Sequence, residues 1–118
     1  MSLNLLELEN AVLNWAEARK ITCPHNGSDV KTQVLKAMSE MGELADNAAK
    51  GRDIQDDVGD VMVCLILVAK LAGTNLTNCL NVAYNDIKDR RGEMINGIFI
   101  KQADLDAHKR KLEIMNDC

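Results

Sequence analysis

The sequence predicts an all-α fold: a four-helix bundle with a short C-terminal β-hairpin and a terminal helix, in one domain spanning residues 1–118. Hydrophobic residues make up 47% of the chain but aromatic residues only 3%, so the core must be built from aliphatic side chains, most of which favour helix. Apolar residues recur every three or four positions along most of the chain, which is the period of a helix. That period changes only around the Asn96-Gly97 pair.

The first predicted helix lies near the start of the chain. Its apolar positions are three and four residues apart: Leu5, Leu8, Val12 and Trp15. The helix is expected to end around Lys20. The segment Cys23–Gly27 contains the only proline, Pro24, followed by Asn26 and Gly27. This composition predicts a loop.

The second helix is expected to start at a cap provided by Ser28 or Asp29 and to stop at Gly51. We expect its apolar stripe to face the core, and the stripe consists of Val30, Val34, Met38, Met41, Leu44, Ala45 and Ala48.

A third helix is predicted from an N-cap at Asp53 through Leu71, closed by Gly73. Its segment Val61–Ala69 is apolar nearly all round, which is typical of a helix buried centrally or between subunits.

A fourth helix is expected from about Leu76 to Arg90, with inward-facing residues Leu76, Leu80, Ala83 and Ile87. Beyond it, the Asn96-Gly97 pair stands between the apolar arms of Met94–Ile100, a pattern that predicts a tight β-hairpin. The segment from Asp104 to about Met115 predicts a short, charged terminal helix.

Charge and hydropathy exclude several classes of protein. A formal net charge of −4 argues against an extended surface for a nucleic acid polymer. The longest apolar run, Val61–Ala69, is too short for a membrane span, so no membrane partner is expected. No CxxC pair and no leader sequence is visible, so reduced thiols and a cytoplasmic location are expected; the cysteines are Cys23, Cys64, Cys79 and Cys118.

Two pairs of acidic residues stand beside apolar stripes, Glu40/Glu43 and Asp57/Asp60. Residues three apart share one face of a helix. If both pairs converged, their carboxylates would repel one another, and Mg²⁺ or Mn²⁺ would relieve that cost. The depths of the two pairs along antiparallel helices match imperfectly, and the same spacing also fits charged residues on solvated helix faces.

The segment Ser39–Ala45, followed by Asp57–Met62, resembles the ExxE…ExxD signature of MazG-like all-α nucleoside triphosphate pyrophosphohydrolases. The resemblance extends to nearly the whole chain and includes Trp15–Ile21, Gln33, Lys36 and Ala83–Gly92. The segment Met94–Lys101 is similar to the tail of small phage or prophage members of the family. The chain departs from the family at Asp57, where Glu is usual, and Asp56 can take its place.

The resemblance implies Mg²⁺-dependent hydrolysis of a nucleoside triphosphate to its monophosphate and pyrophosphate, with Mn²⁺ as an alternative ion. It implies metal ligands at Glu40, Glu43, Asp57 and Asp60, with Glu40 or Glu43 orienting the attacking water. The candidate substrate contacts are Lys36, Asn85, Lys88 and Arg91 for the phosphates and Trp15 for the base, although a Trp at this position also fits simple packing.

Two other functions remain open. One is phosphoribosyl-ATP pyrophosphohydrolase activity, which keeps the chemistry and changes the substrate. The other is a non-catalytic module that binds a nucleotide or mediates helical dimerisation. A homodimer or homotetramer is expected in each case, with Trp15 or Lys101 able to act on a neighbouring chain. The preferred base and sugar are not identified.

Overall fold

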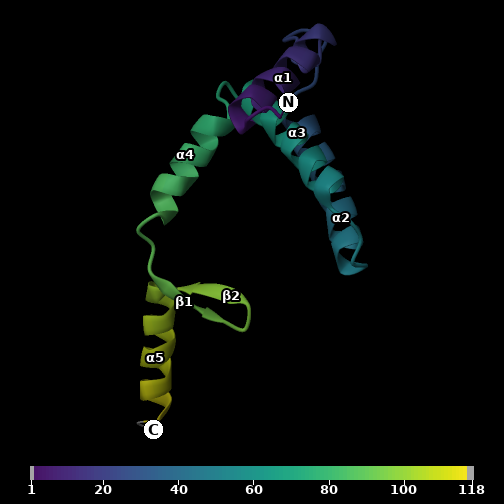
Figure 1. Cartoon of the computed structure of the whole chain (residues 1–118). Helices are drawn as coiled ribbons and strands as arrows, with labels where there is room; N and C mark the ends of the chain where they lie inside the picture. Colours follow the sequence, from purple (N-terminus) through teal and green to yellow (C-terminus); the bar gives the residue numbers. More distant parts are fainter. Residues whose placement is uncertain (1, 117–118) are drawn as a thin grey trace. The chain divides into compact units, whose positions relative to one another are not determined.

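The computed structural model describes residues 2–116 and is mainly helical, with one two-stranded antiparallel sheet (Figure 1). In chain order the elements are α1 (Leu5–Ala18), α2 (Val30–Ala49), α3 (Gln55–Leu71), α4 (Leu76–Ile87), β1 (Gly92–Ile95), β2 (Ile98–Lys101) and α5 (Gln102–Asn116). The helices and the hairpin thus follow the predicted order. The chain divides into two compact units, with the boundary between Leu80 and Asn81. We describe each unit separately.

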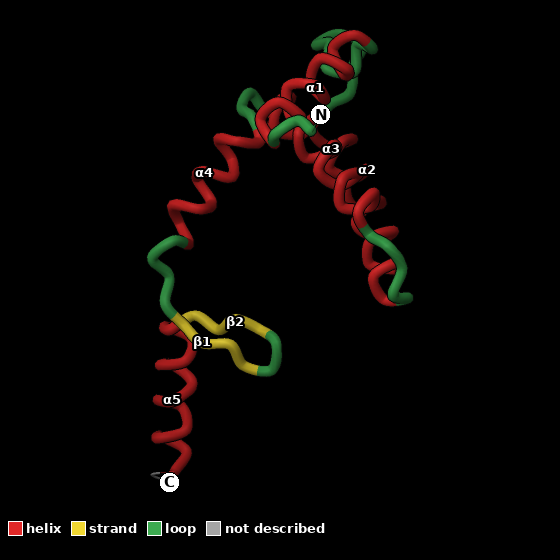
Figure 2. Tube along the Cα trace, in the orientation of Figure 1, coloured by secondary structure: helices red, strands yellow, loops and turns green. Residues whose placement is uncertain are grey.

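The first unit is organised by α2 and α3, which run antiparallel and side by side (Figure 2). The chain reverses at Gly51, whose φ of 67° is the left-handed conformation that glycine adopts without strain. Helix α1 packs against α3. Few side chains in this unit are buried; the apolar ones are Ala16, Ala37, Cys64, Ile66, Leu67 and Ala69.

The starts of the helices follow capping chemistry, with one correction. The Asn4 side chain accepts the backbone N–H of Glu7 and forms a capping box on α1. Asp29, rather than Ser28, caps α2 by accepting the backbone N–H of Thr32 at 2.7 Å. The prediction that Asp53 is the N-cap of α3 was wrong, because Ile54 occupies that position. Asp53 immediately precedes the N-cap, and its side chain accepts the backbone N–H of Gln55.

The expected inward face of α2 is also corrected. Helix α2 meets α3 through Gln33, Ala37, Glu40, Leu44 and Asn47, which are buried or half-buried. Most of the predicted stripe is exposed instead, including Val34, Met38 and Met41. The helix therefore packs with its more polar side against α3.

Glu9 joins α1 to the start of α4. Its side chain is only 3% exposed, and its two carboxylate oxygens accept the backbone N–H of Leu76 and the hydroxyl of Thr77, each at 2.7 Å. An anionic side chain at a helix N-terminus satisfies unpaired N–H groups and meets the positive end of the helix dipole. This contact explains why a charged residue is buried here.

The second unit contains most of α4, the hairpin and α5. Asn96 and Gly97 have φ values of 51° and 81°, which fit the two-residue turn that the Asn-Gly pair predicted. Helix α4 ends at Ile87, three residues earlier than predicted, and α5 starts directly after β2 and packs on both strands. No described residue of this unit is buried, so the expected inward placement of Ala83 and Ile87 was wrong. The prediction was also wrong for Leu80, at the end of the first unit, which is exposed.

None of the described helices is long and apolar enough to cross a membrane. Cys23, Cys64 and Cys79 are free thiols, and Cys118 lies outside the described residues.

We predict that Glu9→Ala lowers the free energy of unfolding by about 2 to 3 kcal/mol, because the Leu76 N–H and the Thr77 hydroxyl lose a charged acceptor in a buried position. Chemical denaturation measures this change. Glu17→Ala removes an exposed acidic side chain from the same helix and should change stability by less than about 0.5 kcal/mol. Equal effects of the two substitutions would contradict the role assigned to Glu9.

Candidate metal and nucleotide site

Three of the four predicted carboxylates interact where α2 packs against α3. Glu40 of α2 and Asp60 of α3 are half-buried, and Glu43 is exposed one turn beyond Glu40. Partial burial raises the pKa of Glu40, and the negative charges of Glu43 and Asp60 and a hydrogen bond with Glu43 raise it further. The structure therefore brings Glu43 and Asp60 within electrostatic reach of Glu40.

Lys36 and Cys64 belong to the same neighbourhood. The positive charge of Lys36 opposes the rise in the pKa of Glu40. Burial raises the pKa of the Cys64 thiol, with a smaller lowering by Lys36 and smaller increases from Glu40 and Asp60. Cys64 is only 2% exposed and follows Asp60 by one turn of α3. Lys36 thus acts electrostatically on the acidic group, and the buried Cys64 lies within reach of the same charges.

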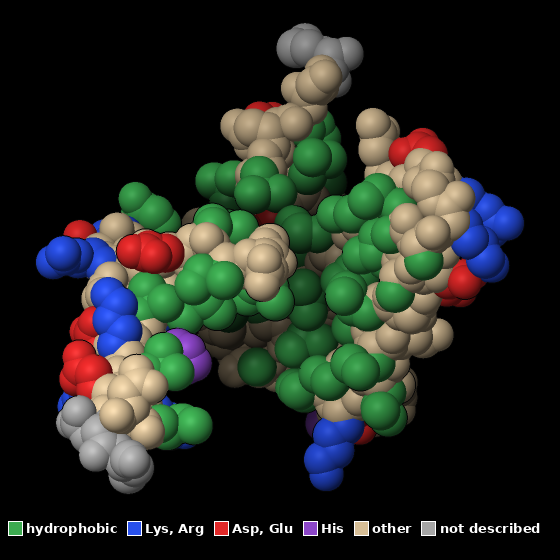
Figure 3. All heavy atoms as spheres, turned by 90° about the horizontal axis from the view of Figure 1, so that it is seen from below, with side chains coloured by type: hydrophobic (Ala, Val, Ile, Leu, Met, Phe, Trp, Pro, Cys, Tyr) green, Lys and Arg blue, Asp and Glu red, His purple; other side chains and the backbone are tan. Residues whose placement is uncertain are grey.

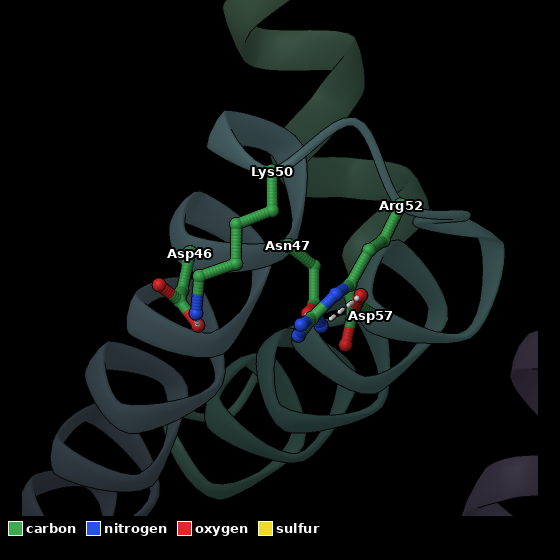
Figure 4. A network of polar contacts seen from close by, with 5 residues as sticks. All are labelled: Asp46, Asn47, Lys50, Arg52 and Asp57. Carbon is green, nitrogen blue, oxygen red and sulfur yellow. Dashed lines mark hydrogen bonds and ion pairs between the residues drawn. The ribbon is translucent and has the colours of Figure 1, made fainter.

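Asp57 lies one turn before Asp60 and has a different partner. Its Oδ2 accepts a hydrogen bond from Nδ2 of Asn47 at 3.0 Å, across the α2–α3 contact (Figure 4). Nη1 of Arg52 in turn donates to Oδ1 of Asn47 at 3.4 Å. An ion pair of 2.9 Å between Lys50 and Asp46 lies on the neighbouring surface of α2. Asp57 is therefore held toward the α2–α3 turn.

The contact between Asn47 and Asp57 fixes the relative depth of the two helices. Because the helices are antiparallel, equal steps away from this contact reach the same level on both. Glu40 is seven residues before Asn47 and Cys64 is seven residues after Asp57, so these two residues lie level with each other. By the same count Glu43 lies almost level with Asp60. Asp60 thus lies almost level with Glu43 and about one turn from the level of Glu40, whereas Asp57 lies about one turn from the level of Glu43 and farther from that of Glu40.

The donor atoms of this acidic group are those of a site for a hard divalent cation. Carboxylate oxygens are the ligands that Mg²⁺ and Mn²⁺ prefer. Besides partial burial, the negative charges of Glu43 and Asp60 raise the pKa of Glu40, and a bound cation would offset that repulsion. The chemistry of the group therefore fits such an ion. Within residues 2–116, however, no three Asp, Glu, His or Cys side chains are already arranged to hold a metal ion.

The predicted substrate residues lie in both units. Trp15 of α1 is 46% exposed, and the guanidinium of Arg19 stacks 4.6 Å from the centroid of its ring. Trp15 also lines a shallow apolar groove of about 280 Å³ with Val12 and Val63. In the second unit, Asn85 lies on α4, whereas Lys88 and Arg91 follow the end of that helix, and all three are exposed.

The sequence did not single out Asn47. It lies seven residues after Glu40 and therefore on the same helix face, so this spacing is the signal that was available. A larger cavity of about 670 Å³ lies between α1 and the C-terminal end of α3 and is lined by Asn10, Asn14, Lys20 and Lys70. None of the predicted site residues lines it.

Comparison with protein-family models, with curated proteins and with solved structures finds no match for this chain. Membership of the MazG-like family thus remains a prediction from the motif residues.

We predict that Glu40→Gln increases the thermal midpoint of unfolding at pH 7 without added divalent cation, because it removes a charge that partial burial and the negative charges of Glu43 and Asp60 disfavour. The folded-state pKa of Glu40 is raised, so its ionisation costs stability as the pH rises from the unfolded pKa through the folded pKa. The gain should therefore be greatest at neutral pH and vanish at a pH below both values. Calorimetry across this range measures it.

Asp46→Asn is the matched control, because Asp46 is exposed on the same helix and paired only with Lys50. It should give no gain. A Glu40→Gln variant that is no more stable than the wild type at pH 7 would contradict the repulsion assigned to this group.

Proposed function

We propose that this chain is a MazG-like nucleoside triphosphate pyrophosphohydrolase of the cytoplasm, which hydrolyses ribo- or deoxynucleoside triphosphates to the monophosphate and pyrophosphate. The observation that carries the proposal is the interacting set Glu40, Glu43 and Asp60 on neighbouring helices, in which burial and like charges raise the pKa of Glu40. Acidic pairs on exposed faces of separate helices would not interact in this way. A MazG-like bundle and a homodimer or homotetramer are part of the same proposal.

Glu40, Glu43 and Asp60, with Asp57 as the fourth ligand, would hold Mg²⁺ or Mn²⁺. The ion, when bound, offsets the negative charge of the triphosphate and makes the α-phosphorus more electrophilic. Asn47 would orient the Asp57 carboxylate by the hydrogen bond that it already donates.

Glu40 is the better candidate for the general base. Glu40 is half-buried where α2 packs against α3, whereas Glu43 is exposed to solvent. Glu40 would take a proton from the water as the water oxygen bonds to the α-phosphorus. The bond from that phosphorus to the bridging oxygen breaks, and pyrophosphate leaves with the electron pair.

Cationic and polar side chains would contact the phosphates. Lys36 lies one turn before Glu40 and already acts electrostatically on it, which makes it the best supported of these residues. Asn85, Lys88 and Arg91 remain candidate phosphate contacts from the second unit. Trp15 remains the candidate for stacking on the base, through the ring face that Arg19 does not cover.

We predict that the wild type releases pyrophosphate from at least one member of a panel of ribo- and deoxynucleoside triphosphates when Mg²⁺ is present. Glu40→Gln, Glu43→Gln and Asp60→Asn should each reduce the rate by roughly a hundredfold or more, because each removes a proposed base or ligand. A coupled pyrophosphate assay gives the rates, and circular dichroism confirms that each variant is folded.

Asp46→Asn, which changes an acidic residue of α2 outside this group, should keep the wild-type rate. No release from any triphosphate with either Mg²⁺ or Mn²⁺ would overturn the catalytic proposal and direct attention to nucleotide binding without turnover.

A further inference from the structure

Arg52 lies in the turn between α2 and α3, and two contacts with Asn47 hold it there. Its backbone N–H donates to the carbonyl oxygen of Asn47 at 2.9 Å, a hydrogen bond that closes the C-terminal end of α2 after the left-handed Gly51. Its side chain turns back toward the same residue, and Nη1 donates to Oδ1 of Asn47 at 3.4 Å. The end of the helix therefore places a guanidinium beside the amide that contacts Asp57.

The direction of the Asn47 amide decides whether it attracts or repels Asp57. The two ends of an amide are similar in shape, but the oxygen accepts hydrogen bonds and the nitrogen donates them. An ionised carboxylate only accepts, so it requires the nitrogen end, as in the 3.0 Å contact between Nδ2 and Oδ2 of Asp57. A guanidinium only donates, so Arg52 bonds the oxygen end (Figure 4). Arg52 therefore selects the amide orientation that Asp57 needs.

Arg52 does not pair with Asp57 directly. Figure 3 shows basic and acidic side chains gathered at the same places on the surface seen from below, yet within residues 2–116 neither Arg52 nor Asp57 belongs to an ion pair. A direct pair would set a positive charge against the carboxylate and oppose the binding of a divalent cation. With the neutral amide between them, Asp57 keeps its charge, and its Oδ1 accepts no hydrogen bond from the described residues.

We propose that Arg52 is a positioning residue of the metal site, which holds the Asn47 amide so that Asn47 binds one oxygen of Asp57 and leaves the other for a divalent cation. The inference rests on the proposed function, because it requires Asp57 to be a ligand. Partners that hold a ligand in place contribute to metal affinity without contacting the metal. Arg52 has this role through Asn47.

Charge and position give opposite effects when Arg52 is replaced. A positive charge near the site repels a divalent cation, so loss of that charge alone would strengthen cation binding. Loss of the donor leaves the Asn47 amide without the contact that selects its direction, and this change would weaken cation binding. The sign of the change in affinity therefore separates a positioning role from a simple charge effect.

The test is Mn²⁺ binding to the full chain without nucleotide, measured from the electron paramagnetic resonance signal of free Mn²⁺. Arg52→Met removes the donor from an exposed side chain and should raise the dissociation constant about threefold or more. Arg52→Lys keeps a cationic donor and should recover part of the affinity. Lys50→Met is the matched control, because it removes an equal charge at the same helix end from a side chain paired with Asp46. It should leave the constant unchanged or lower it.

Asn47→Ala shows whether Arg52 acts through Asn47. In that background Arg52→Met should no longer weaken Mn²⁺ binding. Equal weakening with and without Asn47, or wild-type affinity in Arg52→Met that circular dichroism shows to be folded, would overturn the role of Arg52 and leave the metal site intact.

Asp60→Asn reports on the metal site itself and should weaken Mn²⁺ binding whatever Arg52 does. A wild type that binds no Mn²⁺, or an Asp60→Asn variant that binds it as well as the wild type, would overturn the metal site and the role of Arg52 with it.

Discussion

The antiparallel packing of α2 on α3 is the constraint on which the rest of the first unit depends. It uses the side of α2 that carries Gln33, Glu40 and Asn47, and it leaves the apolar side of the helix exposed. A helix usually turns its apolar stripe toward the core, because burial of apolar area is the main favourable term in folding. In this protein the polar face of α2 packs against α3 instead. As a result carboxylates lie in a half-buried contact, and the apolar face of α2 has no helix of the first unit packed on it.

The same packing gives the acidic residues unequal surroundings. The Asn47–Asp57 hydrogen bond fixes the relative depth of the helices, and this depth sets Asp60 almost level with Glu43, and Glu40 level with the buried Cys64. Burial and like charge then act together on Glu40, whereas Asp57 has a neutral amide partner. Residues that look equivalent in the sequence therefore differ in the chemistry that each can perform.

Both units bury few of their side chains, and the first unit satisfies its contacts incompletely. The Oε1 atom of Gln33 is buried without a hydrogen-bond partner among the described residues, which marks the α2–α3 contact as polar and imperfectly satisfied. In the second unit, the hairpin and α5 bury none of their residues fully. A two-stranded hairpin with one helix gains little stability alone. Association between chains would supply the apolar burial that these elements lack.

The sequence by itself determined the elements of this protein. The Asn96-Gly97 turn, the Asp29 cap and the stops at Gly51 and Gly73 depend on local backbone preferences, so they could be read from neighbouring residues. The acidic pairs were likewise visible as spacings. Only the tertiary structure decided which face of α2 meets α3, that Asn47 contacts Asp57, and that Glu9 is buried against α4, 67 residues along the chain from its partner Leu76. Helical periodicity gives the direction of an apolar stripe but not what covers it, because that depends on contacts between distant segments and between chains.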